Sequence, residues 1–153
     1  MSKVVRPIPE GYHTVTPYLI VKGAARAIEF YTRALGATEL YRMSDGERIG
    51  HAELQIGDSR VMLADEYPER GIHAAAPGKG GCSMLLYVED VDAVVDRAVQ
   101  AGATLERKPE DQFYGDRSGG FVDPFGHRWY VATHVEDVSP DELERRAKAQ
   151  AGA

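Results

Sequence analysis

The stretches LIVKGAARAIEFYTRALGATEL (residues 19–40) and LYVEDVDAVVDRAVQAGATLER (residues 86–107) follow the same pattern, and together they decide the fold. Each begins as an apolar strand end, passes through a short linker into an amphipathic helix, and continues from Gly-Ala-Thr into another extended run. Apolar residues recur at helical spacing in both helices, at Ala27, Ile28, Tyr31 and Leu35 and at Val91, Val94, Val95 and Ala98. The matched order favours a duplicated unit over two unrelated amphipathic helices.

The ends of the helices are also marked in the sequence. Asp90 is placed to cap the second helix, and Gly36 and Gly102 stand where a helix needs a left-handed stop. A third helix is predicted after Ser139, because Ser caps, Pro140 suits the first helical position and Glu142 can close a capping box. Its polar body predicts a surface helix or a frayed tail over 139–153.

Strand formers fill the segments around the first two helices. The first half contains HTVTPYLIV, ATELYRM, IGHAELQIG and SRVMLADE, and the second contains SMLLYVE, ATLERKPE, GGFVD and HRWYVATHV. The sequence therefore predicts an α+β fold of two tandem βαβββ modules with cupped, mainly antiparallel sheets. We expect one domain over 1–138, with modules at about 13–66 and 82–135 joined by a Pro-, Gly- and Ala-rich loop over 67–81.

Composition narrows the classes of function. The chain has 18 basic and 24 acidic side chains and a net charge of −6, which argues against nucleic acid or an anionic membrane surface as a partner. Neither a signal peptide nor an apolar run of membrane-spanning length is visible. The single cysteine, Cys82, excludes an internal disulfide framework, and we expect it to be a buried thiol in a cytoplasmic protein.

Four stretches carry a resemblance to a known family: AIEFYTRALGA, HAELQIGDSRVMLADE, LYVEDVDAVVDRAVQAGA and FYGDRSGGFVDPFGHRWYVATHVEDVSPDEL. From about Thr14 to Val135 the chain resembles the vicinal oxygen chelate superfamily, which includes glyoxalase I, extradiol dioxygenases and the fosfomycin- and bleomycin-resistance proteins. It is particularly similar to the PhnB-like subgroup. The resemblance implies a homodimer and a cleft for a small molecule, but one fold hosts unrelated chemistries.

Metal-using relatives take His, Gln or Glu ligands from the first and last strands of each module. The corresponding positions, counted from the matching motifs, fall on Thr16, Leu63, Ser83 and Tyr130. A shift of one residue gives Pro17, Met62, Met84 and Trp129 or Val131, which are no better ligands. We therefore expect no cofactor and disfavour a divalent metal.

The strand HAELQIG alternates polar and apolar side chains. His51, Glu53 and Gln55 fall on one face, and the apolar residues between them fit beneath the helix. His51 and Glu53 could bind a displaced metal, form an acid–base or hydrogen-bonding pair inside a cavity, or simply face solvent. The alternation of the strand does not decide between these three alternatives.

A second polar cluster lies in FYGDRSGG, residues 113–120. The Tyr114 ring could stack on a ligand, and the planar guanidinium of Arg117 could bind a carboxylate or phosphate. Alternatively, Asp116 and Arg117 could form a local ion pair. Alternation along the other strands projects further hydroxyl-bearing, aromatic or polar residues inward: Thr16, Tyr18, Asp65, Ser83, Tyr87 and Tyr130. This set suits an organic molecule better than a cation.

The last strand, HRWYVATH, separates its two histidines. His127, Trp129 and Val131 are predicted to lie under the helices, with Tyr130 and His134 on the other face. Three functions follow as hypotheses. The first is a non-metal binding protein for a small organic ligand; the second is a lyase, isomerase or dioxygenase with an atypical site at His51 and Glu53. The third is a chain that acts through protein contacts.

Overall fold

The computed structural model describes residues 5–152 of the chain. These residues form two compact units that divide between Ala76 and Pro77. The boundary lies inside the segment 67–81 that was expected to join the modules. That segment is not wholly irregular, since it contains a short 3₁₀ helix, η1 (Pro68–Arg70), closed by an isolated bridge between Tyr67 and Ile72.

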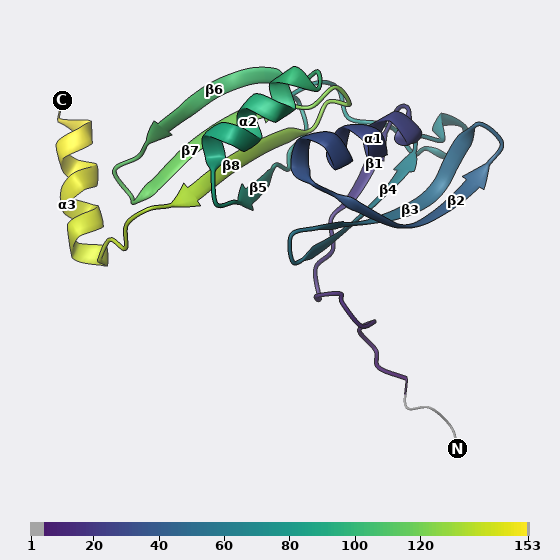
Figure 1. Ribbon diagram of the computed structural model, residues 1–153, viewed down its shortest axis with the longest axis horizontal. Helices are drawn as coiled ribbons and strands as arrows, with labels where there is room; N and C mark the ends of the chain where they lie inside the picture. Colours follow the sequence, from purple (N-terminus) through teal and green to yellow (C-terminus); the bar gives the residue numbers. More distant parts are fainter. Residues whose placement is uncertain (1–4, 153) are drawn as a thin grey trace. The chain divides into compact units, whose positions relative to one another are not determined.

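The first unit has the predicted βαβββ order (Figure 1). Its elements are β1 (Tyr18–Val21), α1 (Ala24–Leu35), β2 (Thr38–Asp45), β3 (Arg48–Ile56) and β4 (Ser59–Asp65). The sheet order is β1-β4-β3-β2, in which β1 and β4 run parallel and the other neighbours antiparallel. Helix α1 covers one face of this sheet (Figure 1).

The second unit repeats this plan. It consists of β5 (Met84–Tyr87), α2 (Val91–Gln100), β6 (Thr104–Asp111), β7 (Asp116–Val122) and β8 (Arg128–His134). The sheet order is β5-β8-β7-β6, again with one parallel pair, β5 and β8. The prediction of two βαβββ modules in an α+β fold is therefore confirmed.

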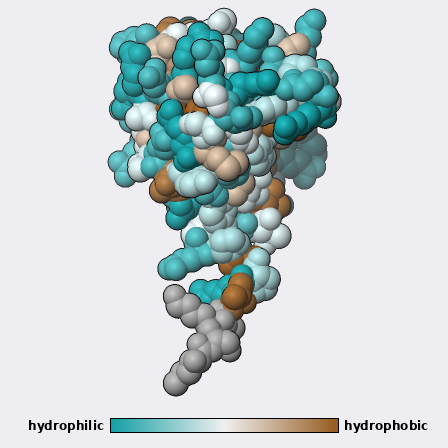
Figure 2. Space-filling model, turned by 90° about the vertical axis from the view of Figure 1, so that its right-hand side faces the viewer, coloured by the Kyte–Doolittle hydropathy of each residue, from teal (hydrophilic) through white to brown (hydrophobic). Residues whose placement is uncertain are grey.

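Each unit has its own core between the helix and one face of the sheet. Alternate residues of β3 are buried as predicted, and the polar residues between them remain partly accessible. In the second unit Trp129 is 1% exposed, and its indole N–H donates to a carboxylate oxygen of Asp123 at 2.9 Å. On the face shown in Figure 2, hydrophilic residues cover most of the surface and hydrophobic residues appear in small groups.

The two main helices begin differently. The Asp90 side chain accepts a hydrogen bond from Ala93 N–H at the start of α2, as predicted. The cap residue of α1 is Gly23, which has no side chain, and the carboxylate of Asp65 at the end of β4 accepts the N–H groups of Gly23 and Ala24 instead. Gly36 ends α1 at φ +68°, in the predicted left-handed conformation.

The third helix, α3 (Pro140–Ala151), begins at the predicted cap, where the Ser139 hydroxyl accepts the N–H of Glu142. None of its described residues is buried. It is tied to the second unit by Arg146, whose guanidinium pairs with Glu136 at 2.7 Å and donates to the carbonyl of Phe113 at 3.0 Å.

Two predictions about single residues are wrong. Cys82 is exposed, because it lies in the irregular segment before β5 and not within the strand. Leu63, counted as a ligand position on the interior of the cup, is completely buried against the helix-facing side of the sheet, in register with buried Ala52. Within residues 5–152, no helix has the length and apolar character needed to span a membrane.

Candidate functional site

The face of the first sheet opposite α1, called the open face below, carries a row of large side chains. Strand register places Tyr18 beside Met62, Met62 beside Glu53, and Glu53 beside Tyr41. Neighbours in register point to the same side of a sheet, so the four side chains share the open face. Tyr18 and Tyr41 are about half exposed there.

Polar contacts link four side chains of this face in the order Tyr12, Glu53, His51 and Tyr18. The Tyr12 hydroxyl donates to Glu53 Oε1 at 2.5 Å, and the Tyr18 hydroxyl lies 2.8 Å from His51 Nδ1. His51 Nε2 lies 3.7 Å from Glu53 Oε1, within ion-pair distance if the imidazole is charged. The predicted pairing of His51 with Glu53 thus exists, and a tyrosine stands at each end of it.

The electrostatics keep both phenols protonated. Burial, followed by the hydrogen bond to Glu53 and its charge, raises the pKa of Tyr12 to about 12. Burial and the charge of Glu53 also raise the pKa of Tyr18. Both hydroxyls are therefore neutral near pH 7 and can donate hydrogen bonds.

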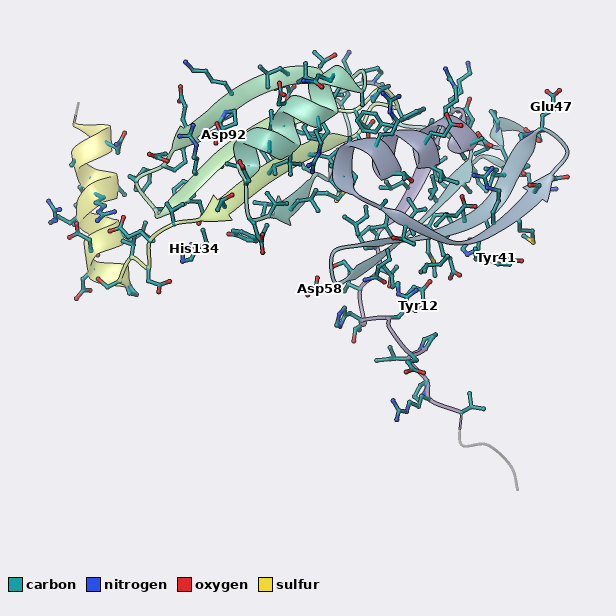
Figure 3. All side chains as sticks on the ribbon, in the orientation of Figure 1. Tyr12, Tyr41, Glu47, Asp58, Asp92 and His134 are labelled. Carbon is teal, nitrogen blue, oxygen red and sulfur yellow. The ribbon has the colours of Figure 1, made fainter. Side chains whose placement is uncertain are left out.

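Sequence reasoning missed Tyr12. Tyr12 belongs to the segment before β1. At the end of this segment, the carbonyl of Pro17 accepts the N–H of Met62 on β4. The Arg60 guanidinium stacks over the Tyr12 ring at 5.3 Å. Figure 3 shows Tyr12 and Tyr41 on the side of the first sheet away from α1. No periodic pattern marks this segment, so the sequence carries no signal for the contact.

A pocket of about 490 Å³ lies within the first unit, beside Tyr18 of this row of polar side chains. Its lining combines apolar, aromatic and polar side chains: Tyr18, Ile20, Met43, Ser44, Asp45, Gly50, Ala64, Asp65, Tyr67, Arg70 and Ile72. Tyr67 forms a rigid wall, because its hydroxyl donates to Asp45 at 3.2 Å and the guanidinium groups of Arg48 and Arg70 lie over its ring. A Cβ added at Gly50 would meet the Tyr67 hydroxyl at 3.5 Å and the end of the Met43 side chain at 3.8 Å.

Asp65 borders the pocket, but its carboxylate is already occupied. One oxygen accepts the N–H groups at the start of α1, and the other accepts the N–H of Ile49 at 2.7 Å. The side chain is only 7% exposed. These contacts support a structural role, and the predicted contact of Asp65 with a ligand stays a prediction.

The second unit has a polar cluster of its own, around His134. The Tyr87 hydroxyl donates to Asp116 at 3.0 Å, and the other oxygen of Asp116 lies 2.7 Å from His134 Nδ1. His134 Nε2 lies 2.7 Å from Asp137. The Tyr114 hydroxyl is 3.4 Å from that of Ser118. Tyr87 and Tyr114, two predicted ligand contacts, therefore lie in one neighbourhood of the second sheet.

Arg117 does not pair with Asp116, the local ion pair that the sequence left open. Its guanidinium makes a bidentate contact with Asp92 of α2, at 2.7 and 2.9 Å, and reaches Asp111 at 3.3 Å. Figure 3 places Asp92 and His134 on opposite sides of the second sheet. The Arg117 guanidinium, which was predicted to bind a ligand, is thus paired with carboxylates of the same protein on the helix side of the sheet.

The remaining predicted contacts are dispersed over both units. Thr16 is partly exposed before β1, Ser83 is exposed just before β5, and the Gln55 amide donates to the carbonyl of Gly57 at 2.7 Å. Tyr130 lies on β8 in register with Leu85 and Gly120. The structure brings together Tyr18, His51 and Glu53, and no hydrogen bond joins Gln55 or Thr16 to these three side chains.

The positions that would supply metal ligands in metal-using relatives do not fit a metal. Thr16, Leu63, Ser83 and Tyr130 offer no imidazole or carboxylate, and on the open face the place of Leu63 is taken by the thioether of Met62. Across residues 5–152, no three His, Cys, Asp or Glu side chains are arranged to hold a metal ion. The chemistry left to this face is aromatic contact, hydrogen bonding and proton transfer.

Known proteins resemble this one in sequence and in fold. The uncharacterized protein Rv0887c of Mycobacterium tuberculosis is 41% identical over 142 residues, which cover 89% of this chain and 83% of that protein. An uncharacterized Arabidopsis thaliana protein, At5g48480, is 32% identical over 77% of this chain and 76% of its own length. The crystal structure of TioX from Micromonospora sp. ML1 superposes with a TM-score of 0.63 at 26% identity, covering 80% of this chain and 99% of TioX.

The family model matches residues 12–131, which include the first βαβββ unit with Tyr12, Tyr18, His51 and Glu53, and the second unit as far as the middle of β8. The chain belongs to the Glyoxalase/Bleomycin resistance protein/Dioxygenase superfamily.

Proposed function

We propose that the protein binds a small organic molecule in the pocket beside Tyr18, Met43 and Tyr67, without the metal ligand set of its metal-using relatives. The observation that carries this proposal is the pocket itself. Its volume of about 490 Å³ falls in the range of small-molecule sites, roughly 300–1,000 Å³. Apolar and aromatic side chains make most of the wall, and a few polar groups at one edge can orient the ligand.

Gly50 gives a direct test. A side chain at this position projects toward Tyr67 and Met43, and its backbone is not in a left-handed conformation, so leucine fills the pocket without backbone strain. With the neutral fluorescent probe N-phenyl-1-naphthylamine, we expect Gly50→Leu to weaken binding by at least about tenfold, because the ligand's space is lost.

Gly81→Leu is the matched control, since nothing lies within 4 Å of a side chain added there and its backbone is likewise unstrained. It should bind the probe like the unmodified protein. Equal binding by both variants, with circular dichroism showing that both are folded, would refute the pocket as the site.

Binding is also proposed to need no divalent metal. Protein dialysed against EDTA should bind the probe with unchanged affinity, and metal analysis of protein purified without chelator should find no stoichiometric divalent ion. An equimolar metal whose removal abolishes probe binding would contradict this.

The contacts of His51 favour a second candidate function, a lyase or isomerase that abstracts a proton next to a carbonyl group. In this function the Nδ1–H of His51 donates to the Tyr18 hydroxyl oxygen and fixes the ring, Nε2 takes the proton from the substrate carbon, and Glu53 stabilises the resulting imidazolium. The test is proton–deuterium exchange into a panel of small ketones and aldehydes, followed by NMR. Exchange should stop in His51→Ala and fall in Glu53→Gln. Exchange that neither substitution changes would remove the assignment.

Two finer assignments belong to the same proposal. The stretch DPFGHRWYVATHVEDVSPDEL supports placement in the PhnB-like subgroup, membership of the superfamily supports a homodimer, and the single cysteine supports the cytoplasm. Sedimentation equilibrium of the full chain tests the dimer directly. A single species of 16.8 kDa at micromolar concentration would contradict it.

A further inference from the structure

The cluster around His134 differs from a binding site, because both nitrogens of its ring are already engaged. Nδ1 faces a carboxylate oxygen of Asp116 and Nε2 faces one of Asp137, each at 2.7 Å. We call these three residues the histidine clamp. A carboxylate oxygen accepts hydrogen bonds, so both contacts are satisfied only when both ring nitrogens carry a proton. The geometry therefore requires the imidazolium form.

The two carboxylates are not equivalent. Asp116 is 6% exposed and also accepts the Tyr87 hydroxyl, whereas the side chain of Asp137 is fully exposed. A neutral imidazole can donate only one hydrogen bond. That bond stays with Asp116, because a buried carboxylate that loses a donor is costly while an exposed one returns to water. Loss of the proton thus releases Asp137.

Asp137 lies in the short segment between β8 and α3. Hydrogen bonds and an ion pair attach this segment, because the N–H groups of Val135 and Glu136 donate to the carbonyl of Gly115, and Arg146 of α3 pairs with Glu136. Val138 lies close to Gly115 just before the helix. No residue of α3 itself is buried among those described, so the helix has no buried apolar side chain to compensate for a lost ionic contact. From this arrangement we infer that the histidine clamp is a pH-sensitive fastener that holds the C-terminal helix to the second unit.

The surrounding charges set the pH window. The titratable and charged groups near the clamp are Asp116 on β7, Tyr87 on β5, Tyr114 before β7, Glu136 and Asp137 after β8, and Glu142 and Arg146 on α3. Hydrogen bonds to Asp116 and then Asp137 raise the pKa of His134. A raised folded-state pKa means that the clamp contributes fully below the ordinary histidine pKa and is lost as pH rises through the raised value. Arg146 lowers the pKa of Glu136, so that contact persists across this range.

NMR on the full ¹⁵N-labelled chain tests the inference in two measurements. The ring nitrogens of His134 should both be protonated at pH 6 and should titrate above the ordinary histidine pKa. Amide protection factors in α3, corrected for the intrinsic exchange rate, should fall about two- to fivefold through the same titration, the effect of one exposed ion pair.

Asp137→Asn should remove the step in α3 protection while leaving the rest of the second unit folded, because Asp137 is exposed. Glu144→Gln is the matched control: it removes an exposed carboxylate of α3 that pairs with Lys148, and it should keep the step. A His134 ring that is neutral at pH 6, or a step of equal size in Asp137→Asn, would overturn the inference.

Discussion

The two units build the start of the same helix from different parts of the chain. Helix α2 is capped by Asp90, three residues before the amide that it accepts. Helix α1 begins at a glycine, and its first amides are held by Asp65, 41 and 42 residues away on β4. The second unit therefore specifies its helix start locally, and the first specifies it only once strand β4 has paired. A repeated fold does not require repeated contacts.

The histidines show the same contrast. His51 has a phenol at 2.8 Å and a carboxylate at 3.7 Å, so only one of these two partners is within hydrogen-bond distance. His134 is held at 2.7 Å by a carboxylate on each side. Each cluster also reaches beyond its sheet, to Tyr12 in the N-terminal segment and to Asp137 before the C-terminal helix. The cluster around His51 borders the pocket of the proposed ligand, and the cluster around His134 is the proposed fastener of α3.

The largest expected effect comes from removing the long-range cap. Asp65→Ala leaves three amides without their acceptor in a buried site, those of Gly23, Ala24 and Ile49. We expect the free energy of unfolding to fall by about 3 kcal/mol or more. Urea unfolding followed by circular dichroism measures it. A loss below 1 kcal/mol would show that water replaces the carboxylate and would erase the contrast with α2.

A smaller loss is expected from the local cap. Asp90→Ala removes the acceptor for Ala93, but the neighbouring amide of Val91 still donates to the Thr133 hydroxyl at 3.0 Å. The expected cost is about 1 kcal/mol, the usual value for an N-cap. Asp90→Asn serves as the control, because it keeps an accepting oxygen and should be nearly neutral. Equal losses for Asp90→Ala and Asp65→Ala would break the comparison.

The smallest effect is expected at the N-terminal end of the polar chain. Tyr12→Phe removes one partly buried hydrogen bond to Glu53 and should cost about 0.5–1 kcal/mol.

The same contact predicts a titration. Glu53→Gln removes the charge and the ionic hydrogen bond, so the pKa of Tyr12 should fall from about 12 but stay above its ordinary value, because burial is the largest cause of the shift. Ultraviolet difference titration against Tyr12→Phe isolates this phenol from the other tyrosines. An unchanged Tyr12 titration in Glu53→Gln would contradict the contact.

The fold was predictable because its signals are local. Apolar residues at helical spacing, alternation along HAELQIG, and the caps at Asp90 and Ser139 each depend on neighbours within one turn or one strand. The pairing of His51 with Glu53 followed from the same alternation. These features survive folding because packing of the core favours the conformation that each segment already prefers.

The errors and omissions come from contacts between distant segments. Arg117 of β7 meets Asp92 of α2, 25 residues earlier in the sequence, a pairing that no local pattern encodes. The contact between Tyr12 and Glu53 joins an irregular segment to a strand 41 residues later. For Leu63, counting positions from a motif in the first half missed the face by one residue, and in a strand one residue reverses the side.

The position of Trp129 determines what fluorescence measurements on this protein report. It is the chain's single tryptophan, and the hydrogen bond from its indole to Asp123 fixes it in the core of the second unit. Its fluorescence is a reporter for one half of the molecule, while the first half signals through tyrosine and backbone absorption alone. A melting curve recorded at the tryptophan wavelength reports directly on the second unit, and the unit that holds the pocket needs a probe of its own.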